Sequence, residues 1–469
     1  MFTIHLNTKS KTPLYDQIYT YIKDEIRSGS IPYQAKLPST RSLATYLQVS
    51  RNTVDMAYSQ LVSEGYIESK SKSGYYVCQI AEMLTLPERA SIKQIRTQQT
   101  KPHFNYDFSP FAIDIHHFPY NTWRKLSKEC LNNFNNDLFL LGHKQGDIDF
   151  RVAIQKYLHE SRGVQCDKEQ IIVGAGADYL LQLLAQLLQA LSETCKIAME
   201  NPTYTQAYRI FRGLGVTTCC IPLDNSGISI DQLKLSGANI AYVTPSHQYP
   251  LGIIMPIKRR QALLRWANEE ENRYIIEDDH DSEFRYKGKP IPALQGLDQN
   301  GKVIYIGTFS RAIAPAIRVG YLVLPQALLT LYKSKYNYYT STVSRIDQAI
   351  LTAFINDGYF ERHLNKMRTR YKGKHDALIQ ALKIFKSKVS IQGEHAGLHL
   401  VVTFHLPLTE EELIARAAQS SIKLYGLKDF FISFNETKYY EPTILLGYAN
   451  LTEDEIINGI EHLYQALFD

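Results

Sequence analysis

The sequence lacks the features that mark exported, membrane-spanning and metal-binding proteins. No apolar run approaches the ~20 residues that a transmembrane helix needs. The N-terminus has no basic stretch followed by an apolar one, so no export signal is expected. The six cysteines include no Cys-x-x-Cys pair, and the adjacent Cys219 and Cys220 have poor geometry for a disulfide. These absences predict a cytoplasmic protein with reduced thiols, no membrane association and no metal site.

A strong charge bias is also missing. The formal net charge is +5, which permits nucleic-acid binding but does not by itself indicate it. The chain has 469 residues, of which 44% are hydrophobic, so it can bury a large core and does not have the composition of a disordered protein. At this length we expect two or three domains.

The first part of the chain has the pattern of three helices followed by a β-hairpin. Apolar residues recur every four positions within residues 12–28, which predicts a helix with Thr12-Pro13 as its cap and first turn. Ser39 is expected to cap a second helix, and Ser50 a third that runs from Arg51 to about Glu64. Two helices separated by three or four residues form a helix-turn-helix, whose second helix lies in the major groove of DNA.

Polar and basic side chains in this region can contact DNA. The first turn of the third helix and the tip of the hairpin supply hydrogen-bond donors for bases and phosphates. Residues 1–78 contain nine Lys and Arg against six Asp and Glu, so +3 of the net charge lies in this sixth of the chain. The alternative is a generic helical cap with a solvated Lys/Ser loop. The candidates from this pattern are Arg51, Asn52, Thr53, Lys70 and Lys72.

The rest of the chain predicts a linker and a large α/β domain. Residues 79–104 lose periodicity and are polar and basic, as in a linker. Within residues 105–469, short apolar runs alternate with helical patterns, which predicts a largely parallel sheet covered by helices on both faces. Ligands of such sheets bind at the carboxyl ends of the strands. The expected strands are Ile171–Val173, Lys196–Met199, Ile240–Val243, Tyr274–Ile276 and Val303–Ile306.

The last part, from about residue 330, predicts a smaller α+β subdomain. It contains one long helical pattern over residues 346–384 and two apolar runs typical of strands, Leu398–Thr403 and Thr443–Leu446. A final amphipathic helix is expected over Glu453–Phe468.

Two motifs in the first part resemble the winged-helix domain of GntR-type regulators. They read L-P-S-T-R-S-L-A and V-S-R-N-T-V. Matched motif to motif, the resemblance assigns DNA contacts to Arg41, Ser50, Arg51 and Thr53, and a contact of the wing to Gly74.

Residues 105–469 resemble a fold-type I aminotransferase domain, through Thr244–Gly252, Ile276–Phe284 and Val303–Tyr321. Together with its head, the whole chain resembles the MocR/GabR subfamily of bacterial regulators. This resemblance implies a mixed fold, with a small α+β winged helix-turn-helix head joined to a large α/β fold-type I PLP-dependent aminotransferase-like domain. It also implies a homodimer, domain-swapped head to tail, a double-stranded DNA operator and a small-molecule effector, commonly with pyridoxal 5'-phosphate (PLP).

The resemblance also assigns a cofactor site. By motif, Asp278 would pair with the ring nitrogen of PLP, Tyr204 would stack on the ring and Arg318 would bind the phosphate. His280 stands where the family usually has a tyrosine that hydrogen-bonds to the ring oxygen, a bond that imidazole can also make. The expected site comprises Ala175, Gly176, Tyr204, Asp278, His280, Thr308, Ser310, Arg311 and Arg318.

Several of these positions depart from the family pattern. Arg311 stands where the family has the Schiff-base lysine. A guanidinium stays protonated and is a poor nucleophile, so we expect no catalysis, and PLP bound non-covalently at most or not at all. We expect Arg311 to act instead as a fixed positive charge that anchors an anion. Asp178 would face the phosphate, and at ~4 Å two like charges repel by about 4 kcal/mol at an effective dielectric of 20. Gln206 and Asp429 replace arginines that bind carboxylates in amino-acid-sensing relatives, so no acidic effector is expected.

Other interpretations stay open. A PLP-dependent enzyme with an appended DNA-binding domain would need a substitute lysine, for which Lys287 and Lys289 are the candidates nearest in sequence. A constitutive repressor that senses no ligand would not need a substitute lysine. The lysine could also have been changed to Arg311 by design, but the accompanying Asp178 and Gln206 favour natural divergence.

Overall fold

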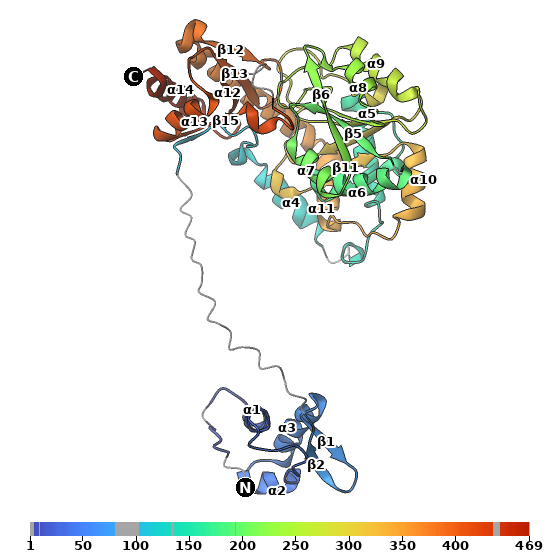
Figure 1. The fold of residues 1–469 in the computed structure, drawn as a ribbon, viewed down its shortest axis with the longest axis vertical. Coiled ribbons are helices and arrows are strands. Elements are labelled where there is room, and N and C mark those ends of the chain that lie inside the picture. Colours follow the sequence, from blue (N-terminus) through green and yellow to red (C-terminus); the bar gives the residue numbers. More distant parts are fainter. Residues whose placement is uncertain are drawn as a thin grey trace. The chain divides into compact units, whose positions relative to one another are not determined.

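The computed structural model describes residues 4–8, 10–79, 103–132, 136–192, 194–434 and 441–468. The chain forms two compact units, Met1–Lys101 and Pro102–Asp469 (Figure 1). Apart from Gln79, His103 and Phe104, the expected linker lies outside the described residues. Within these described ranges, no helix is long and apolar enough to cross a membrane.

The first unit contains three helices and a two-stranded antiparallel hairpin around its own core. Ile18 and Ile22 of the first helix, Val54 and Leu61 of the third, and Val77 of the hairpin are buried in this core. The elements are α1 (Leu14–Arg27), α2 (Thr40–Leu47), α3 (Arg51–Ser63), β1 (Ile67–Lys70) and β2 (Gly74–Val77).

The helix caps explain where α2 and α3 begin. The Ser39 hydroxyl accepts a hydrogen bond from the backbone N–H of Ser42, and Ser50 accepts one from Thr53, which satisfies N–H groups that have no partner within the helix. Both caps were predicted. The predicted cap on α1 was wrong, because Pro13 itself occupies the capping position and no side chain caps this helix.

The second unit is built on an eight-stranded sheet with the order β4-β11-β10-β9-β8-β5-β6-β7. The five strands from β10 to β6 pair in parallel, whereas β11 runs antiparallel to both of its neighbours. The five predicted strands are present as β4, β5, β8, β9 and β10, and the other three, β6, β7 and β11, were not predicted. The strands are β4 (Ile171–Gly174), β5 (Lys196–Asn201), β6 (Thr217–Asp224), β7 (Gly227–Ile228), β8 (Ile240–Val243), β9 (Tyr274–Asp278), β10 (Val303–Thr308) and β11 (Gly320–Val323).

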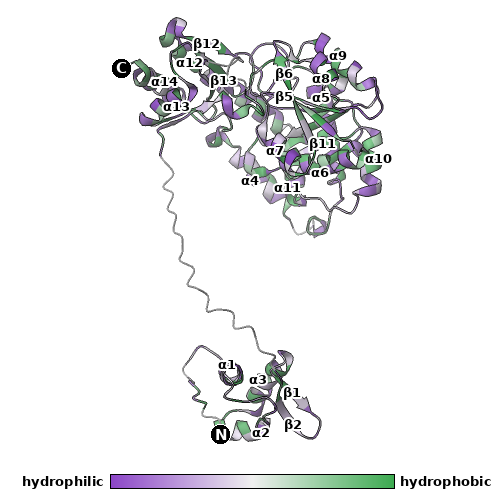
Figure 2. Ribbon diagram, in the orientation of Figure 1, coloured by the Kyte–Doolittle hydropathy of each residue, from purple (hydrophilic) through white to green (hydrophobic). Residues whose placement is uncertain are grey.

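Helices cover both faces of this sheet. Neighbouring residues of a strand point to opposite sides, so apolar side chains on both sides of a strand need a layer of helices to pack against. In β10, Ile304 and Ile306 pack with α6 (Gly176–Leu191), α7 (Thr205–Gly213) and α10 (Gln326–Lys335). Val303 and Tyr305 face the opposite layer, which contains α5 (Ile148–Arg162), α8 (Ile230–Leu235) and α9 (Ile257–Asn268). Helix α9 is largely hydrophilic, as expected for the outside of this layered unit, whereas α10 combines hydrophilic residues with buried leucines (Figure 2).

The predicted α+β subdomain is present, but its long helix is two helices. The chain turns at Gly358, whose φ of 71° lies in the left-handed region that glycine adopts without strain. The sheet has the order β12-β13-β16-β15. The elements of this part are α11 (Arg345–Asn356), α12 (Tyr359–Leu382), β12 (Val389–Gln392), β13 (His399–Phe404), α13 (Glu410–Gln419), β15 (Tyr425–Gly426), β16 (Thr443–Gly447) and α14 (Glu453–Phe468).

The start of the second unit lies against this subdomain. Strand β3 (Tyr106–Asp107) pairs in parallel with β14 (Ile422–Lys423). Phe108 then accepts a backbone hydrogen bond from Gly447 of β16. The chain therefore crosses the subdomain before it reaches α4 (Tyr120–Cys130).

Candidate functional site

The candidate DNA contacts at α3 are held by its N-terminal cap. Arg51 and Asn52 are exposed, and 68% of the Arg51 side chain is accessible although its Nε lies 3.4 Å from the Asp55 carboxylate. The hydroxyls of Ser50 and Thr53 are 2.8 Å apart, so these two side chains bond to each other. Arg41 is exposed on α2. The first turn of α3 thus presents its longest donor side chain to solvent while the cap fixes the backbone.

The hairpin forms the predicted wing. Lys70 and Gly74 face each other at its closed end, and Lys72 is exposed with a φ of 60°. The Lys70 ammonium lies 3.0 Å from Glu68, which neutralises part of the basic charge. Lys36 was not among the predicted residues. Its ammonium lies 5.7 Å from the centre of the Tyr76 ring in the wing. No local motif could reveal Lys36, because it reaches the wing through an isolated bridge from far along the chain.

In the second unit, a pocket of about 200 Å³ opens beside the carboxyl ends of β9 and β10. Seven of the nine expected cofactor residues line it. Ala175 and Gly176 do not, but the Ala175 carbonyl lies 3.5 Å from Arg318 Nη2 and accepts its hydrogen bond. The lining residues are Phe111, Ala177, Asp178, Tyr204, Thr244, Tyr249, Asp278, Asp279, His280, Asp281, Glu283, Thr308, Ser310, Arg311, Pro315 and Arg318.

One wall of the pocket combines a carboxylate with aromatic rings. Asp278 ends β9 and accepts a hydrogen bond from the Tyr242 hydroxyl, while burial raises the pKa of its carboxyl group. Burial also raises the pKa of Tyr204 to about 12. Tyr204 makes an edge contact with Tyr249, with 6.2 Å between the ring centres. The Tyr249 hydroxyl is buried and has no hydrogen-bond partner among the described residues.

All three guanidinium nitrogens of Arg311 contact the protein. Its Nε lies 3.1 Å from the Asp281 carboxylate, and its two Nη atoms donate to the carbonyl oxygens of Pro110 at 2.6 Å and Ala112 at 3.2 Å. Burial would raise the pKa of Asp281, but the Arg311 and His280 charges outweigh it and hold that pKa well below its usual range. The expectation of a free anion anchor at Arg311 is therefore not met, because a buried carboxylate already pairs with its charge.

Arg318 is paired as well. Its Nη2 lies 3.0 Å from the carboxylate of Asp178, in the first turn of α6. Gly176 packs so closely that an added Cβ would lie 3.0 Å from the Arg318 guanidinium. The sequence placed Asp178 and Arg318 at the same end of the pocket but could not show that they would bind each other.

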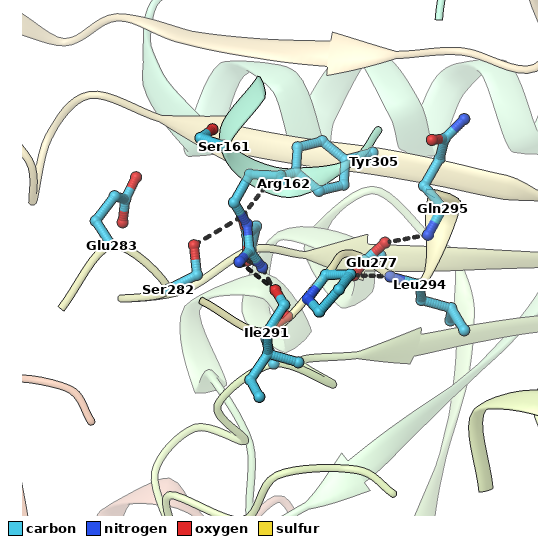
Figure 3. Close-up of polar contacts among 12 residues, drawn as sticks. Ser161, Arg162, Glu277, Ser282, Glu283, Ile291, Leu294, Gln295 and Tyr305 are labelled. Carbon is cyan, nitrogen blue, oxygen red and sulfur yellow. Dashed lines mark hydrogen bonds and ion pairs between the residues drawn. The ribbon is translucent and has the colours of Figure 1, made fainter. Parts of the chain in front are cut away.

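Behind the pocket, Asp279 is held by a buried polar network. Arg162, at the end of α5, donates two hydrogen bonds of 2.9 Å to its carboxylate. The Arg162 side chain lies among Tyr305, Ser282 and Ile291 (Figure 3). The hydroxyls of Ser282 and Tyr305 also donate to Asp279. With Arg162 and Asp279 only 3% and 4% exposed, this network fixes the pocket wall instead of contacting a ligand.

Comparison with known families agrees with this architecture. Residues 14–77 match the model of bacterial regulatory proteins of the gntR family, and residues 112–463 match aminotransferase class I and II. The chain belongs to the MocR/GabR subfamily of GntR-type regulators. Its relatives in that subfamily include the probable rhizopine catabolism regulatory protein MocR of Rhizobium meliloti. It is 32% identical, over 98% of this chain and 95% of that protein.

Two further similarities extend over most of the MocR/GabR-type chain. The uncharacterized HTH-type transcriptional regulator YdeL of Bacillus subtilis (strain 168) is 39% identical, over 99% of both chains. The fold of the second unit is similar to that of Pyrococcus horikoshii kynurenine aminotransferase, solved in complex with PMP. That match has a TM-score of 0.67 and 24% identity, and covers 78% of this chain and 91% of the other.

The pocket of this MocR/GabR-type chain does not fit covalently held PLP. Tyr204 and Asp278 suit the ring, but no lysine is among the described residues that line the pocket. Lys287 and Lys289, the candidate substitutes, are exposed and lie outside the lining. At the phosphate end, Arg318 already carries a carboxylate partner. Gln206 and Asp429 are exposed and do not line the pocket, so they provide no contact to a ligand bound there.

Proposed function

We propose that the chain is a DNA-binding transcription regulator whose aminotransferase-like domain senses a small molecule without catalysing transamination. In this proposal residues 1–78 form the DNA-binding domain, 79–104 the linker, and 105–469 the effector-binding and dimerisation domain of a cytoplasmic protein. The operator is contacted through the exposed start of α3 and the wing. The proposed contacts are Arg41, Ser50, Arg51, Asn52, Thr53, Lys70, Lys72 and Gly74.

The engagement of Arg311 is the observation that carries this proposal. Arg311 stands at the family position of the Schiff-base lysine, and it cannot form an imine because its guanidinium stays protonated. All three of its nitrogens contact the chain, at Asp281, Pro110 and Ala112, so the protein itself holds the guanidinium in place. A pocket built in this way can bind a ligand but lacks the nucleophile of an aminotransferase.

The same contacts connect the pocket to the segment that follows the proposed linker. Pro110, Phe111 and Ala112 follow the linker along the chain, and two of their carbonyls are held by a pocket residue. Phe111 also lines the pocket and stacks on Phe430, with ring centres 6.0 Å apart. A ligand that contacts Phe111 or Arg311 would therefore alter the anchoring of the segment into which the linker leads.

A homodimer is part of the proposal, and exposed apolar side chains in the second unit support it. Phe139, Leu140 and Leu141 are 71%, 64% and 88% exposed, in a row that a monomer would leave in contact with water. Sedimentation of the purified protein should give twice the chain mass. Leu141→Glu should shift it toward the monomer, whereas a matched change at the exposed Leu235 of α8 should not.

Two measurements on the full chain test the function. DNA fragments selected by the purified protein should yield a specific operator, and a cell extract of small molecules should change its affinity for that operator. Mixing the protein with PLP and reducing with borohydride should leave no pyridoxyl-lysine in the pocket. A specific lysine adduct together with amino-group transfer would establish an enzyme instead, and operator binding that no extract changes would support a constitutive repressor.

A further inference from the structure

The two arginines that line the pocket are both neutralised by carboxylates of the chain itself. Arg311 pairs with Asp281 at 3.1 Å, and Arg318 pairs with Asp178 at 3.0 Å. A third lining acid, Asp279, is held from behind by Arg162. Two lining acids remain that no arginine of the described residues pairs with, Asp278 and Glu283. The pocket therefore offers a ligand two further acidic side chains but no arginine without a carboxylate partner, although a family phosphate site is recognisable in its sequence.

The Arg318 pair differs from the other two in its exposure. The Arg318 and Asp178 side chains are 52% and 39% accessible, whereas Asp281 is fully buried. An ion pair this exposed contributes little to stability, so it is not needed to hold the fold. Its effect is on the ligand. A phosphate that approached Arg318 would lie next to the Asp178 carboxylate and would have to compete with it for the same guanidinium.

A second feature shows that the pocket is built for a ligand. Tyr249 is only 1% exposed and lines the pocket, yet its hydroxyl has no hydrogen-bond partner among the described residues. A buried polar group without a partner costs free energy, which a ligand hydrogen bond removes. The Tyr249 ring also packs against Tyr204, which lines the pocket too and whose ring can stack on a flat ligand.

From these contacts we infer that Asp178 determines the ligand class of the pocket: it occupies the anion site of Arg318, so the pocket excludes phosphate esters and takes an uncharged or cationic compound. This inference rests on the proposed sensing function, because it assumes that the pocket binds a ligand. Tyr204, Tyr249 and Asp278 would contact the body of that ligand, and no phosphate group is required to hold it.

The test uses two probes that differ only in a phosphate. Pyridoxamine and pyridoxamine 5'-phosphate carry the same ring, and neither can form an imine with a lysine. Titration calorimetry on the full chain should show that the wild type binds pyridoxamine more tightly than pyridoxamine 5'-phosphate. Asp178→Asn, which removes the charge and keeps the shape, should strengthen binding of the phosphate by about tenfold relative to pyridoxamine. Asp178→Ser should act in the same direction.

Two further variants identify the group that is freed. Adding Arg318→Gln to Asp178→Asn should abolish the gain, because the phosphate then has no arginine to bind. Asp231→Asn, which removes an exposed acid from the first turn of α8, should leave both affinities unchanged. A wild type that binds the phosphate as tightly as pyridoxamine or more tightly, or an Asp178→Asn protein that shows no phosphate-dependent gain, overturns the inference. These titrations contain no DNA, so the proposed function fails separately, through operator binding that no ligand changes.

Discussion

The Arg311 guanidinium donates a hydrogen bond of 2.6 Å to the carbonyl oxygen of Pro110, 201 positions earlier in the chain. The same guanidinium pairs with the buried Asp281. A single side chain therefore connects the pocket carboxylate to the segment that follows the linker. A lysine has one nitrogen at the end of a flexible stem and could not reach all three partners in this geometry. The arginine is thus suited to holding this segment in place.

Replacing this arginine should loosen the segment and destabilise the second unit. In Arg311→Gln the Asp281 carboxylate loses its cation inside the protein, and breaking such a buried pair costs about 3–5 kcal/mol. Amide hydrogens at residues 108–114 should exchange faster with deuterium, because the carbonyls of Pro110 and Ala112 lose their donors. Mass-spectrometric hydrogen exchange and thermal melting measure the two effects.

The double variant Arg311→Gln with Asp281→Asn separates the loss of stability from the faster hydrogen exchange. It removes the stranded charge, so much of the stability should return, while exchange at residues 108–114 stays fast. If exchange in this segment matches the wild type in both proteins, Arg311 does not hold the segment and the proposed connection is wrong.

The network around Asp279 leads to a prediction about geometry rather than charge. Arg162 donates from Nε and Nη2 to the Asp279 carboxylate and also donates from Nη2 to the Ser246 hydroxyl at 2.8 Å. Arg162→Lys keeps the positive charge but cannot make this set of bonds. We expect it to lower the stability of the second unit by about 2 kcal/mol, in the range for a lost buried hydrogen bond to a charged group. Urea unfolding followed by tryptophan fluorescence measures it, and a loss below 0.5 kcal/mol, about the value for an exposed pair, would contradict it.

Much of the fold was predictable because its signals are local. A capping serine acts on an N–H three residues ahead, so Ser39 and Ser50 could be identified from their neighbours. The buried parallel strands are short apolar runs bounded by turn residues. The break at Gly358 was hidden, because the apolar pattern continues through it and a single glycine within a helical pattern does not reveal its φ.

The site was predictable as a set of residues but not as a set of pairs. Motifs assigned Asp278, Arg311 and Arg318 to one pocket, and all three line it. Which carboxylate binds which arginine depends on the order of the strands and on the path of the chain after the linker. Asp178 and Arg318 are 140 positions apart in the chain. Arg318 lies just before β11, and Asp178 lies in α6, which begins just after β4. The two side chains meet because β11 pairs with β4. No sequence spacing encodes that contact.

Stability should depend on pH through Glu200, a fully buried carboxyl group. It accepts hydrogen bonds from the Thr244 N–H at 3.2 Å and hydroxyl at 3.1 Å, while its other oxygen has no partner among the described residues. Burial raises its pKa to about 7, although these bonds oppose the rise. The native state therefore keeps a proton that the unfolded chain loses above pH 4.5. This contribution to stability is present below pH 4.5 and is lost as the pH rises through 7.

Glu200→Gln removes this titration and keeps the acceptor for Thr244. Relative to the wild type, the variant should gain roughly 3 kcal/mol of stability as the pH rises from 4.5 to 8, because each pKa unit corresponds to about 1.4 kcal/mol. Thermal melting of both proteins across this range measures the difference. Melting curves that shift in parallel at every pH would show that Glu200 does not titrate between the two states.

Operator recognition should depend on Arg51 at the exposed start of α3. Its only charged partner among the described residues is Asp55, at 3.4 Å, and the side chain is accessible enough to turn toward a base edge. Arg51→Ala should weaken specific binding by about 1–3 kcal/mol and reduce discrimination at the base pair it reads. Arg209→Ala, which removes an exposed arginine from the second unit, is the matched control and should leave operator affinity unchanged.

Fluorescence anisotropy with the selected operator and a scrambled duplex distinguishes a base contact of Arg51 from a phosphate contact. Equal weakening on both duplexes would assign Arg51 to a phosphate, and unchanged binding would remove it from the recognition surface.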